Sequence, residues 1–305
     1  MIIRKNEHWF KMLFIWKGSV LSKIMYRLML LFILSFAVVF LKGNLFHYKI
    51  PLNPAPFTLF GIALALFLGF RNSASYDRFW EARKIWGALT FDSRSLTRQV
   101  LTISGYKTDS KETDCFINYL ICFAYALKHQ LRHTDATADM EMRLTPECCA
   151  VLKDAKHKPV LLIKAMGDWV QQAKVNGKID SILQLAFEAN LNKLSEIVGV
   201  CERIASTPIP FAYSVLLHRT VYIYCFLLPF GFVDSLGWFT PILTIFIAYT
   251  FVAFEAIADE IEMPFGIESN DLALNSICQN TEISLLEMAG KPIPVYPVPS
   301  NYFLD

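Results

Sequence analysis

The chain has 305 residues, of which 54% are hydrophobic and 14% aromatic, and its mean hydropathy is +0.37. This composition is too apolar for a soluble domain of this length and indicates an integral membrane protein. The formal net charge is only +2, so the total charge does not indicate a nucleic-acid-binding protein. The seven cysteines form no CxxC pair, which predicts reduced thiols rather than a disulfide framework.

The first predicted elements are a basic segment and two membrane helices. Residues 1–24 combine lysine, arginine and aromatic side chains, which predicts an amphipathic segment lying on the inner leaflet. The uncharged run Leu28–Leu41 predicts the first transmembrane helix. A second uncharged run, Ile50–Phe70, begins with three prolines, so the second helix is expected to start near Pro56.

The stretch Phe57–Trp86 contains no turn signal between its apolar first half and its charged second half. It therefore predicts one long helix that begins in the membrane and ends in water. Ile62, Leu66 and Phe70 recur every fourth residue, so they stack along one face of this helix. Repeated around an axis, the face would form a narrow apolar constriction; core packing between helices is the alternative.

Residues 71–219 contain no apolar run long enough to span a membrane. Charged and apolar residues alternate there at helical spacing, which predicts a soluble helical domain. Turns or helix caps are predicted at Asp109–Lys111, Arg143–Pro146 and Asn176–Gly177. The Thr207–Pro210 segment is predicted to end the domain.

Two further uncharged runs, Thr220–Val233 and Ser235–Phe254, predict the third and fourth membrane helices. The prolines and glycines within Pro229–Pro241 predict a tight outer turn between them. Asp271–Ala289 predicts a last amphipathic helix. The proline-rich tail from Lys291 is expected to be extended and to lie over a surface.

Lysine and arginine crowd the N-terminal segment and residues 71–219. The positive-inside rule then places both termini and the helical domain in the cytoplasm, with four spans in the inner membrane. The fold class expected is an all-α integral membrane protein. Its expected parts are the juxtamembrane segment 1–24, helices one and two in 25–76, the cytosolic domain 77–212, helices three and four in 213–258, a cytosolic segment 259–289 and a tail 290–305.

Three carboxylates, Glu255, Asp259 and Glu262, share a helical face just past the fourth helix. Such a face can bind a hard cation, or its carboxylates can be solvated or pair with arginines. The arginines in question are Arg71, Arg78 and Arg83. His218 is expected to be an interfacial anchor, although a titrating role is open.

The chain has no glycine-rich phosphate loop and no Ser/His/Asp or Cys/His arrangement. No catalytic residue and no firm metal ligand are therefore assigned, and the chain is not expected to be an enzyme. A membrane-bound carboxylate metalloenzyme and a non-conducting membrane scaffold are remote alternatives.

Four longer motifs carry a resemblance to a known family. They are LGFRNSASYDRFWEARKIWG (68–87), RIASTPIPFAYSVLLHR (203–219), YCFLLPFG (224–231) and EIEMPFG (260–266). Together they resemble the bestrophin family in its bacterial branch, over roughly residues 10–285.

The resemblance implies a homopentameric channel that passes small monovalent ions through the bilayer, with four membrane helices per subunit. It implies a pore neck lined by Ile62, Leu66 and Phe70. It also implies a second narrowing at the cytosolic exit, near Ile182, with Ile179 as the alternative. An apolar ring of this kind can gate by dewetting without a charged filter. The partners expected are further copies of the chain, lipid and monovalent ions, and no nucleic acid.

Animal members of this family hold calcium in the acidic stretch that corresponds to MPFGIESND (263–271). Glu268 and Asp271 stand at positions of such a calcium clasp, but Met263 replaces an expected oxygen ligand. Calcium activation is therefore expected to be weak or absent, and no cofactor is required. Together with Glu262, these two carboxylates remain possible metal-binding or cation-attracting groups.

Charge selectivity is left open by the residues. The segment from Thr220 to Gly290 has several carboxylates but no lysine or arginine, and an acidic vestibule concentrates cations. Helix N-termini near Pro56 would favour anions. A slight preference for cations is expected, and a chloride channel, as in animal bestrophins, is the alternative.

Overall fold

The computed structural model describes all residues except 3–7, 13, 17, 46–47, 50–52 and 297–303. The described part is helical apart from two short antiparallel strands, β1 (Asn44–Leu45) and β2 (Tyr48–Lys49), in which Asn44 faces Lys49. The chain divides into two compact units. We call them the apolar unit (residues 4–79 and 208–263) and the bundle unit (residues 1–3, 80–207 and 264–305).

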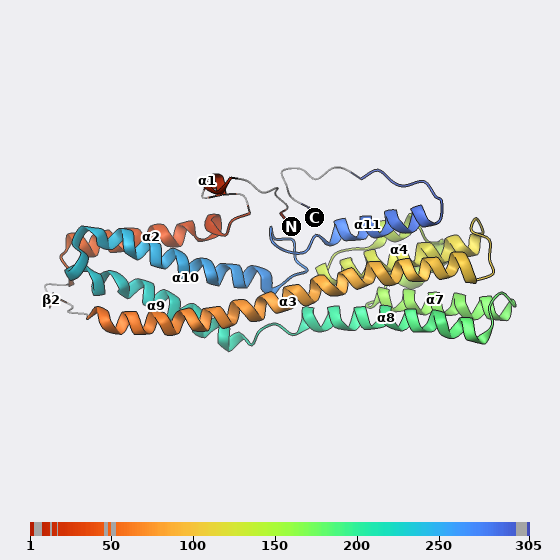
Figure 1. The fold of residues 1–305 in the computed structure, drawn as a ribbon, viewed down its shortest axis with the longest axis horizontal. Helices are drawn as coiled ribbons and strands as arrows, with labels where there is room; N and C mark the ends of the chain where they lie inside the picture. The colour runs from red at the N-terminus through yellow and green to blue at the C-terminus, as the bar shows by residue number, and fades with distance from the viewer. Residues whose placement is uncertain (3–7, 13, 17, 46–47, 50–52, 297–303) are drawn as a thin grey trace. The chain divides into compact units, whose positions relative to one another are not determined.

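The apolar unit contains most of the long hydrophobic helices (Figure 1). Its long helices are α2 (Leu21–Phe40), the first part of α3 (Pro54–Ile103), α9 (Phe211–Leu236) and α10 (Thr240–Glu262); it also contains the short helix α1 (Trp9–Met12) and the 3-10 turn Gly237–Phe239. Their shared core is built from side chains such as Ile24, Leu64, Leu68, Leu217, Val221, Leu228 and Val252. Burial of this apolar surface holds α2, α9 and α10 around one side of α3.

Three described helical segments are long and apolar enough to cross a membrane by length and composition: Leu21–Phe40, Ala55–Ile103 and Phe211–Glu262. The third segment contains two helices, α9 and α10, because the turn Gly237–Phe239 interrupts it. Gly237 has φ +51° there, a conformation that glycine adopts without strain.

Two predicted boundaries were wrong. Pro229 and Gly231 lie inside α9 rather than in the outer turn; an apolar helix tolerates proline when its neighbours satisfy the freed backbone groups. A Cβ atom on Gly231 would lie only 2.9 Å from the ring of Phe57, so the absence of a side chain at Gly231 lets α9 pack closely against α3.

The second wrong boundary lies at the N-terminus, where α1 is only four residues long and α2 begins at Leu21 rather than near Leu28.

The predicted single long helix is confirmed and is longer than expected. α3 runs without interruption over 50 residues, from Pro54 to Ile103. It starts close to Pro56, where proline suits the first helical turn, and no proline follows within it. Its second part, from Trp80, belongs to the bundle unit.

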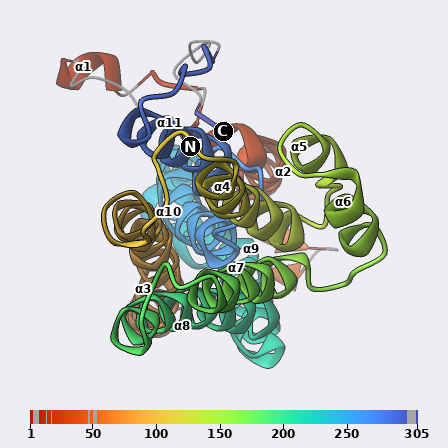
Figure 2. The same ribbon diagram turned by 90° about the vertical axis from the view of Figure 1, so that its right-hand side faces the viewer.

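The other helices of the bundle unit are α4 (Lys111–Arg132), α5 (Thr137–Glu141), α6 (Pro146–Lys153), α7 (Lys158–Val175), α8 (Ser181–Ser206) and α11 (Leu274–Met288). Figure 2 shows α7 between α4 and α8, in agreement with their contacts. The core of the unit contains large buried side chains, including Trp86, Leu96, Phe116, Phe123, Leu127 and Phe187. The seven cysteines of the chain are free, and burial raises the pKa of the Cys122 thiol to about 12.

The turns predicted in this unit are confirmed by helix caps. Ser110 accepts a hydrogen bond from the Thr113 N–H at the start of α4, and Thr145 accepts one from the Cys148 N–H at the start of α6. α7 ends at Val175, and the predicted turn residue Asn176 is its C-cap. The Ser110 and Thr145 side chains satisfy backbone donors that the first helical turn leaves without a partner.

Candidate ion pathway and its surroundings

One face of α3 is exposed and apolar. Ile62, Leu66 and Phe70 are 58%, 59% and 70% exposed in the single subunit, whereas Leu64 and Leu68 are 2% and 1% exposed. The alternation follows the helical period, so one side of α3 packs in the apolar unit while the other carries the three predicted neck residues. They do not pack in the core of the single subunit, and their assignment as a pore neck stays a prediction.

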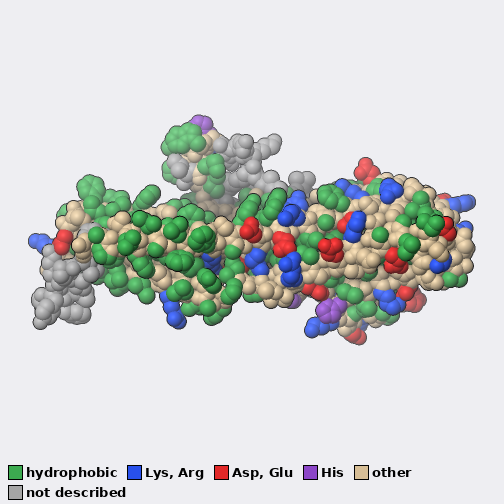
Figure 3. Space-filling model, turned by 60° about the horizontal axis from the view of Figure 1, so that its bottom comes forward, with side chains coloured by type: hydrophobic (Ala, Val, Ile, Leu, Met, Phe, Trp, Pro, Cys, Tyr) green, Lys and Arg blue, Asp and Glu red, His purple; other side chains and the backbone are tan. Residues whose placement is uncertain are grey.

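The opposite side of α3 packs closely against α9. The Tyr224 hydroxyl donates a hydrogen bond to the Phe57 carbonyl at 3.2 Å. A Cβ atom on Gly61 would lie 2.6 Å from the Tyr224 hydroxyl oxygen. The absence of a side chain at Gly61 therefore permits this close approach of the two helices. Figure 3 shows how hydrophobic side chains dominate the visible surface of the apolar unit.

The acidic face at the C-terminal end of α10 is paired with basic side chains. Arg71, which follows the neck face, contacts Asp259 and lies 3.6 Å from Glu262. The Arg78 guanidinium donates to the Glu262 backbone carbonyl at 3.1 Å. The sequence analysis offered pairing with arginines as one role for these carboxylates, and this role is confirmed for Arg71. The contacts hold α10 to α3 at this point.

Two more carboxylates of α10 have basic neighbours. His218 Nδ1 lies 2.7 Å from a carboxylate oxygen of Glu255, which is buried. Lys23 Nζ lies 3.5 Å from a carboxylate oxygen of Glu260. Among the residues that the structure describes, no three His, Cys, Asp or Glu side chains gather as metal ligands.

The two candidates for the cytosolic narrowing differ in exposure. Ile182, in the first turn of α8, is 76% exposed, whereas Ile179 is 5% exposed and belongs to the core. The Asp180 carboxylate caps α8 by accepting from the backbone N–H groups of Ile182 and Leu183. Of the two, only Ile182 presents its side chain to solvent; its assignment to the narrowing stays a prediction.

The stretch that resembles a calcium clasp is a compact loop in the bundle unit. The Asp271 carboxylate accepts a hydrogen bond from the Glu268 backbone N–H at 2.7 Å, and Asp271 is 2% exposed. Arg132 donates to the backbone carbonyls of Phe265 and Leu272 at 3.2 and 3.4 Å. Protein groups thus hold the loop closed.

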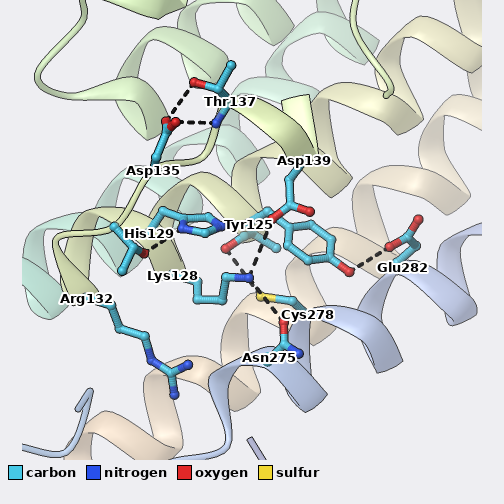
Figure 4. Close-up of polar contacts among 12 residues, drawn as sticks. Tyr125, Lys128, His129, Arg132, Asp135, Thr137, Asp139, Asn275, Cys278 and Glu282 are labelled. Atoms are coloured by element: carbon cyan, nitrogen blue, oxygen red, sulfur yellow. Dashed lines mark hydrogen bonds and ion pairs between the residues drawn. The ribbon is translucent and has the colours of Figure 1, made fainter. Parts of the chain in front are cut away.

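A buried polar cluster joins α4, α5 and α11, and the sequence analysis missed it (Figure 4). Glu282 accepts hydrogen bonds from the Tyr125 hydroxyl at 2.8 Å, from the Tyr296 hydroxyl at 2.6 Å and from Arg143 at 2.6 Å. Burial raises the pKa of Tyr125, so its hydroxyl stays protonated and donates. The Tyr296 contact also holds the described start of the C-terminal tail against the bundle, as expected for the tail.

The second half of this cluster surrounds Asp139. Its carboxylate lies 2.9 Å from His129 Nε2 and 3.5 Å from Lys128 Nζ, and Lys128 also donates to the Asn275 side chain at 3.1 Å. Burial lowers the pKa of His129, which favours its neutral form. The signal in the sequence was a lone lysine in an apolar run of α4, because such a lysine is buried only with partners.

Comparison with known proteins decides the family. The family model for bacterial and fungal bestrophin proteins matches residues 1–287. This chain belongs to the bestrophin family. The resemblance drawn from the four sequence motifs is therefore confirmed.

Relatives of this bestrophin have similar length. A protein of Ralstonia nicotianae named as a voltage-dependent anion channel-forming protein is 46% identical over 292 residues, covering 96% of this chain and 95% of its own. The voltage-dependent anion channel-forming protein YneE of Escherichia coli strain K12 is 41% identical over 304 residues, covering 99% of both chains.

A solved structure supports the fold. The crystal structure of a bacterial bestrophin homologue from Klebsiella pneumoniae matches this bestrophin with a TM-score of 0.84 and 40% sequence identity. The match covers 88% of this chain and 99% of the other. The predominantly helical architecture of this chain is therefore that of a bacterial bestrophin.

Proposed function

We propose that this bestrophin forms an ion-conducting pore as a homopentamer, with α2, α3, α9 and α10 as four membrane helices in each subunit. The observation that carries the proposal is the exposed apolar face of α3, formed by Ile62, Leu66 and Phe70. In a membrane helix an exposed apolar face lies against lipid or against another helix; repeated around an axis, this face lines a narrow neck that dewetting can close. Ile182 is proposed for the cytosolic narrowing.

We propose the inner membrane as its location, with both termini in the cytoplasm. The distribution of lysine and arginine supports this orientation, because they crowd the N-terminal segment and the bundle unit. The names of the relatives, which describe channel-forming proteins, support a membrane location and a channel rather than an enzyme or a scaffold. Ion flux through liposomes that contain only the purified protein would exclude the scaffold.

For the permeating charge, the first proposal is an anion such as chloride, because relatives at 41–46% identity are named as anion channel-forming proteins. The cation preference inferred from the acidic segment after Thr220 has no support in the comparisons. It also loses much of its physical basis, since Glu255, Glu260 and Glu262 are buried and lie near basic side chains. Buried, paired carboxylates contribute little field to a vestibule.

One observation keeps a cation channel as the second candidate. Asp77 lies seven residues after Phe70 on α3, which places it two turns further along the neck face. Asp77 is exposed, whereas Arg71 is buried and Arg78 half-buried, each about 100° around the helix from the neck face. A ring of five Asp77 carboxylates at one end of the neck would attract cations and repel anions.

Replacing Asp77 by asparagine tests this balance. We expect the permeability ratio to shift toward anions by about threefold, because the ring of negative charge is removed. The measurement is the reversal potential of purified protein in planar bilayers under a salt gradient. Asp168→Asn is the control, because that carboxylate belongs to an exposed surface pair with Lys164. An unchanged reversal potential would show that Asp77 does not act on the permeating ion.

The same recording assigns the charge for the wild type. A reversal potential displaced toward the anion equilibrium supports the first proposal. Displacement toward the cation equilibrium replaces it with the second, and absence of current contradicts the channel itself.

Calcium is proposed to be unnecessary for opening. We expect the current to change by less than about twofold between a calcium chelator and millimolar calcium, because backbone and arginine groups already hold the 263–271 loop closed. Bilayer recordings with both solutions on the cytosolic side check this. A calcium-dependent rise in open probability that Asp271→Asn abolishes would contradict it and would assign a metal site to the loop.

A further inference from the structure

A buried arginine lies directly after the last neck residue. Arg71 follows Phe70 in α3, and its side chain is 4% exposed. Its guanidinium contacts the Asp259 carboxylate, lies 3.6 Å from Glu262 Oε2 and donates to the Ser214 hydroxyl at 3.4 Å. Two helices, α9 and α10, are therefore tied to α3 one residue beyond the neck.

Glu262 connects further parts of the apolar unit at the same place. Its carboxylate accepts a hydrogen bond from the Ile209 N–H at 3.0 Å, in the segment before α9. Its backbone carbonyl accepts one from Arg78 at 3.1 Å. The Asn72 amide adds a hydrogen bond to the Phe254 carbonyl of α10 at 3.1 Å. Glu262 therefore anchors both α3 and the start of α9.

The two carboxylates that face Arg71 are not equivalent. The Glu262 side chain is 11% exposed, whereas that of Asp259 is 59% exposed. Water screens an exposed carboxylate and competes for its hydrogen bonds, whereas a buried one interacts more strongly. Loss of the Glu262 charge would leave the buried guanidinium with Asp259, which water screens, as its one carboxylate partner in the part of the chain that the structure describes, an arrangement that favours movement of the arginine.

The surroundings give Phe70 room to move. Phe70 and Arg71 both line a cavity of about 780 Å³ between α3 and the start of α9, with mostly apolar walls such as Phe67, Tyr213 and Leu217. A side chain beside empty space has fewer contacts that fix its rotamer. The orientation of Phe70 then depends on how firmly the neighbouring backbone of α3 is held.

We propose that Glu262, acting through Arg71, is a positioning residue that sets the orientation of Phe70 and hence the width of the neck. This inference rests on the proposed channel function. Arg71 and Phe70 are consecutive on one helix, so any rotation of α3 that relaxes Arg71 also turns Phe70 relative to the pore axis.

The test is single-channel recording of Glu262→Gln in planar bilayers. Glutamine keeps the shape of the side chain and an acceptor oxygen for the Ile209 N–H, but removes the charge that attracts Arg71. We expect unitary conductance to rise about threefold, because Phe70 turns into the cavity and widens the neck. Glu262→Asp, which keeps the charge, is expected to give an intermediate value and serves if the glutamine variant does not fold.

A double variant separates positioning from general destabilisation. With Phe70→Ala as background, Glu262→Gln is expected to change conductance by less than about 20%, because the side chain through which it acts is gone. An equal rise in both backgrounds would overturn the role assigned to Phe70. Glu81→Gln is the matched control: it breaks an Arg–carboxylate pair on the same helix, with Arg203 at 2.6 Å, and is expected to leave conductance unchanged.

The outcomes for the two proposals are distinct. Absence of wild-type current would overturn the channel function and this inference with it. Wild-type current together with unchanged conductance in Glu262→Gln would overturn the positioning role alone.

Discussion

Replacing Leu66 by alanine is expected to raise single-channel conductance about tenfold, equivalent to a barrier lowered by about 1.4 kcal/mol. The side chain is 59% exposed in the single subunit, so its truncation removes little core packing. In the assembled pore the truncation would widen an apolar ring, which lowers the free energy needed to keep the neck filled with water. Ile62→Ala and Phe70→Ala are expected to act in the same direction.

The matched control is Leu64→Ala, on the opposite side of the same helix. Leu64 is 2% exposed, so its truncation leaves a cavity and should lower stability by about 2–5 kcal/mol. Channels that still fold should conduct as the wild type does. Planar-bilayer recordings of the four variants make the comparison, and unchanged currents in all three neck variants would remove the neck assignment.

Replacing Arg143 by methionine is expected to lower the free energy of unfolding of the bundle unit by about 3–5 kcal/mol. Arg143 contacts Glu282 at 2.6 Å, and their side chains are 12% and 5% exposed. Removing the guanidinium leaves the buried Glu282 carboxylate with hydrogen bonds from the neutral hydroxyl groups of Tyr125 and Tyr296. A buried charge without a counter-charge is strongly destabilising.

Denaturation of detergent-solubilised protein, followed by circular dichroism, measures this loss. Arg203→Met is the control, because its pair with Glu81 is 61% and 40% exposed and should contribute only about 0–1 kcal/mol. The double variant Arg143→Met, Glu282→Met should recover part of the stability, since no unpaired charge is then buried. Equal losses for Arg143→Met and Arg203→Met would show that the cluster is not a strong stabilising element.

Local patterns predicted the helical elements well. Apolar spacing and the lack of a turn signal predicted α3 as a single helix, and polar caps predicted the starts of α4 and α6. These features depend on neighbours within a few residues. The turn predicted within Pro229–Pro241 is present at Gly237–Phe239, but it begins later than expected, because tertiary packing of α9 outweighs the local helix-breaking signal of Pro229.

The candidate site could be predicted only in part. The periodicity of α3 is sufficient to put Ile62, Leu66 and Phe70 on one face. Ile179 and Ile182 could not be ranked from sequence, because their exposure depends on how α8 is capped and packed. The pairing of Arg71 with Glu262 joins residues far apart in the chain, and no local pattern encodes such a choice of partner.

The pairing of Arg71 also imposes an order on biosynthesis. Its partner Asp259 lies 188 residues later in the chain, so a ribosome adding about 5–20 residues per second needs about 10–40 s to reach it. Throughout that interval the nascent chain carries an unmatched cation at the end of an apolar helix. Water, lipid headgroups or the insertion machinery must solvate this cation until α10 emerges. Synthesis of nearly the whole polypeptide thus precedes closure of its apolar unit.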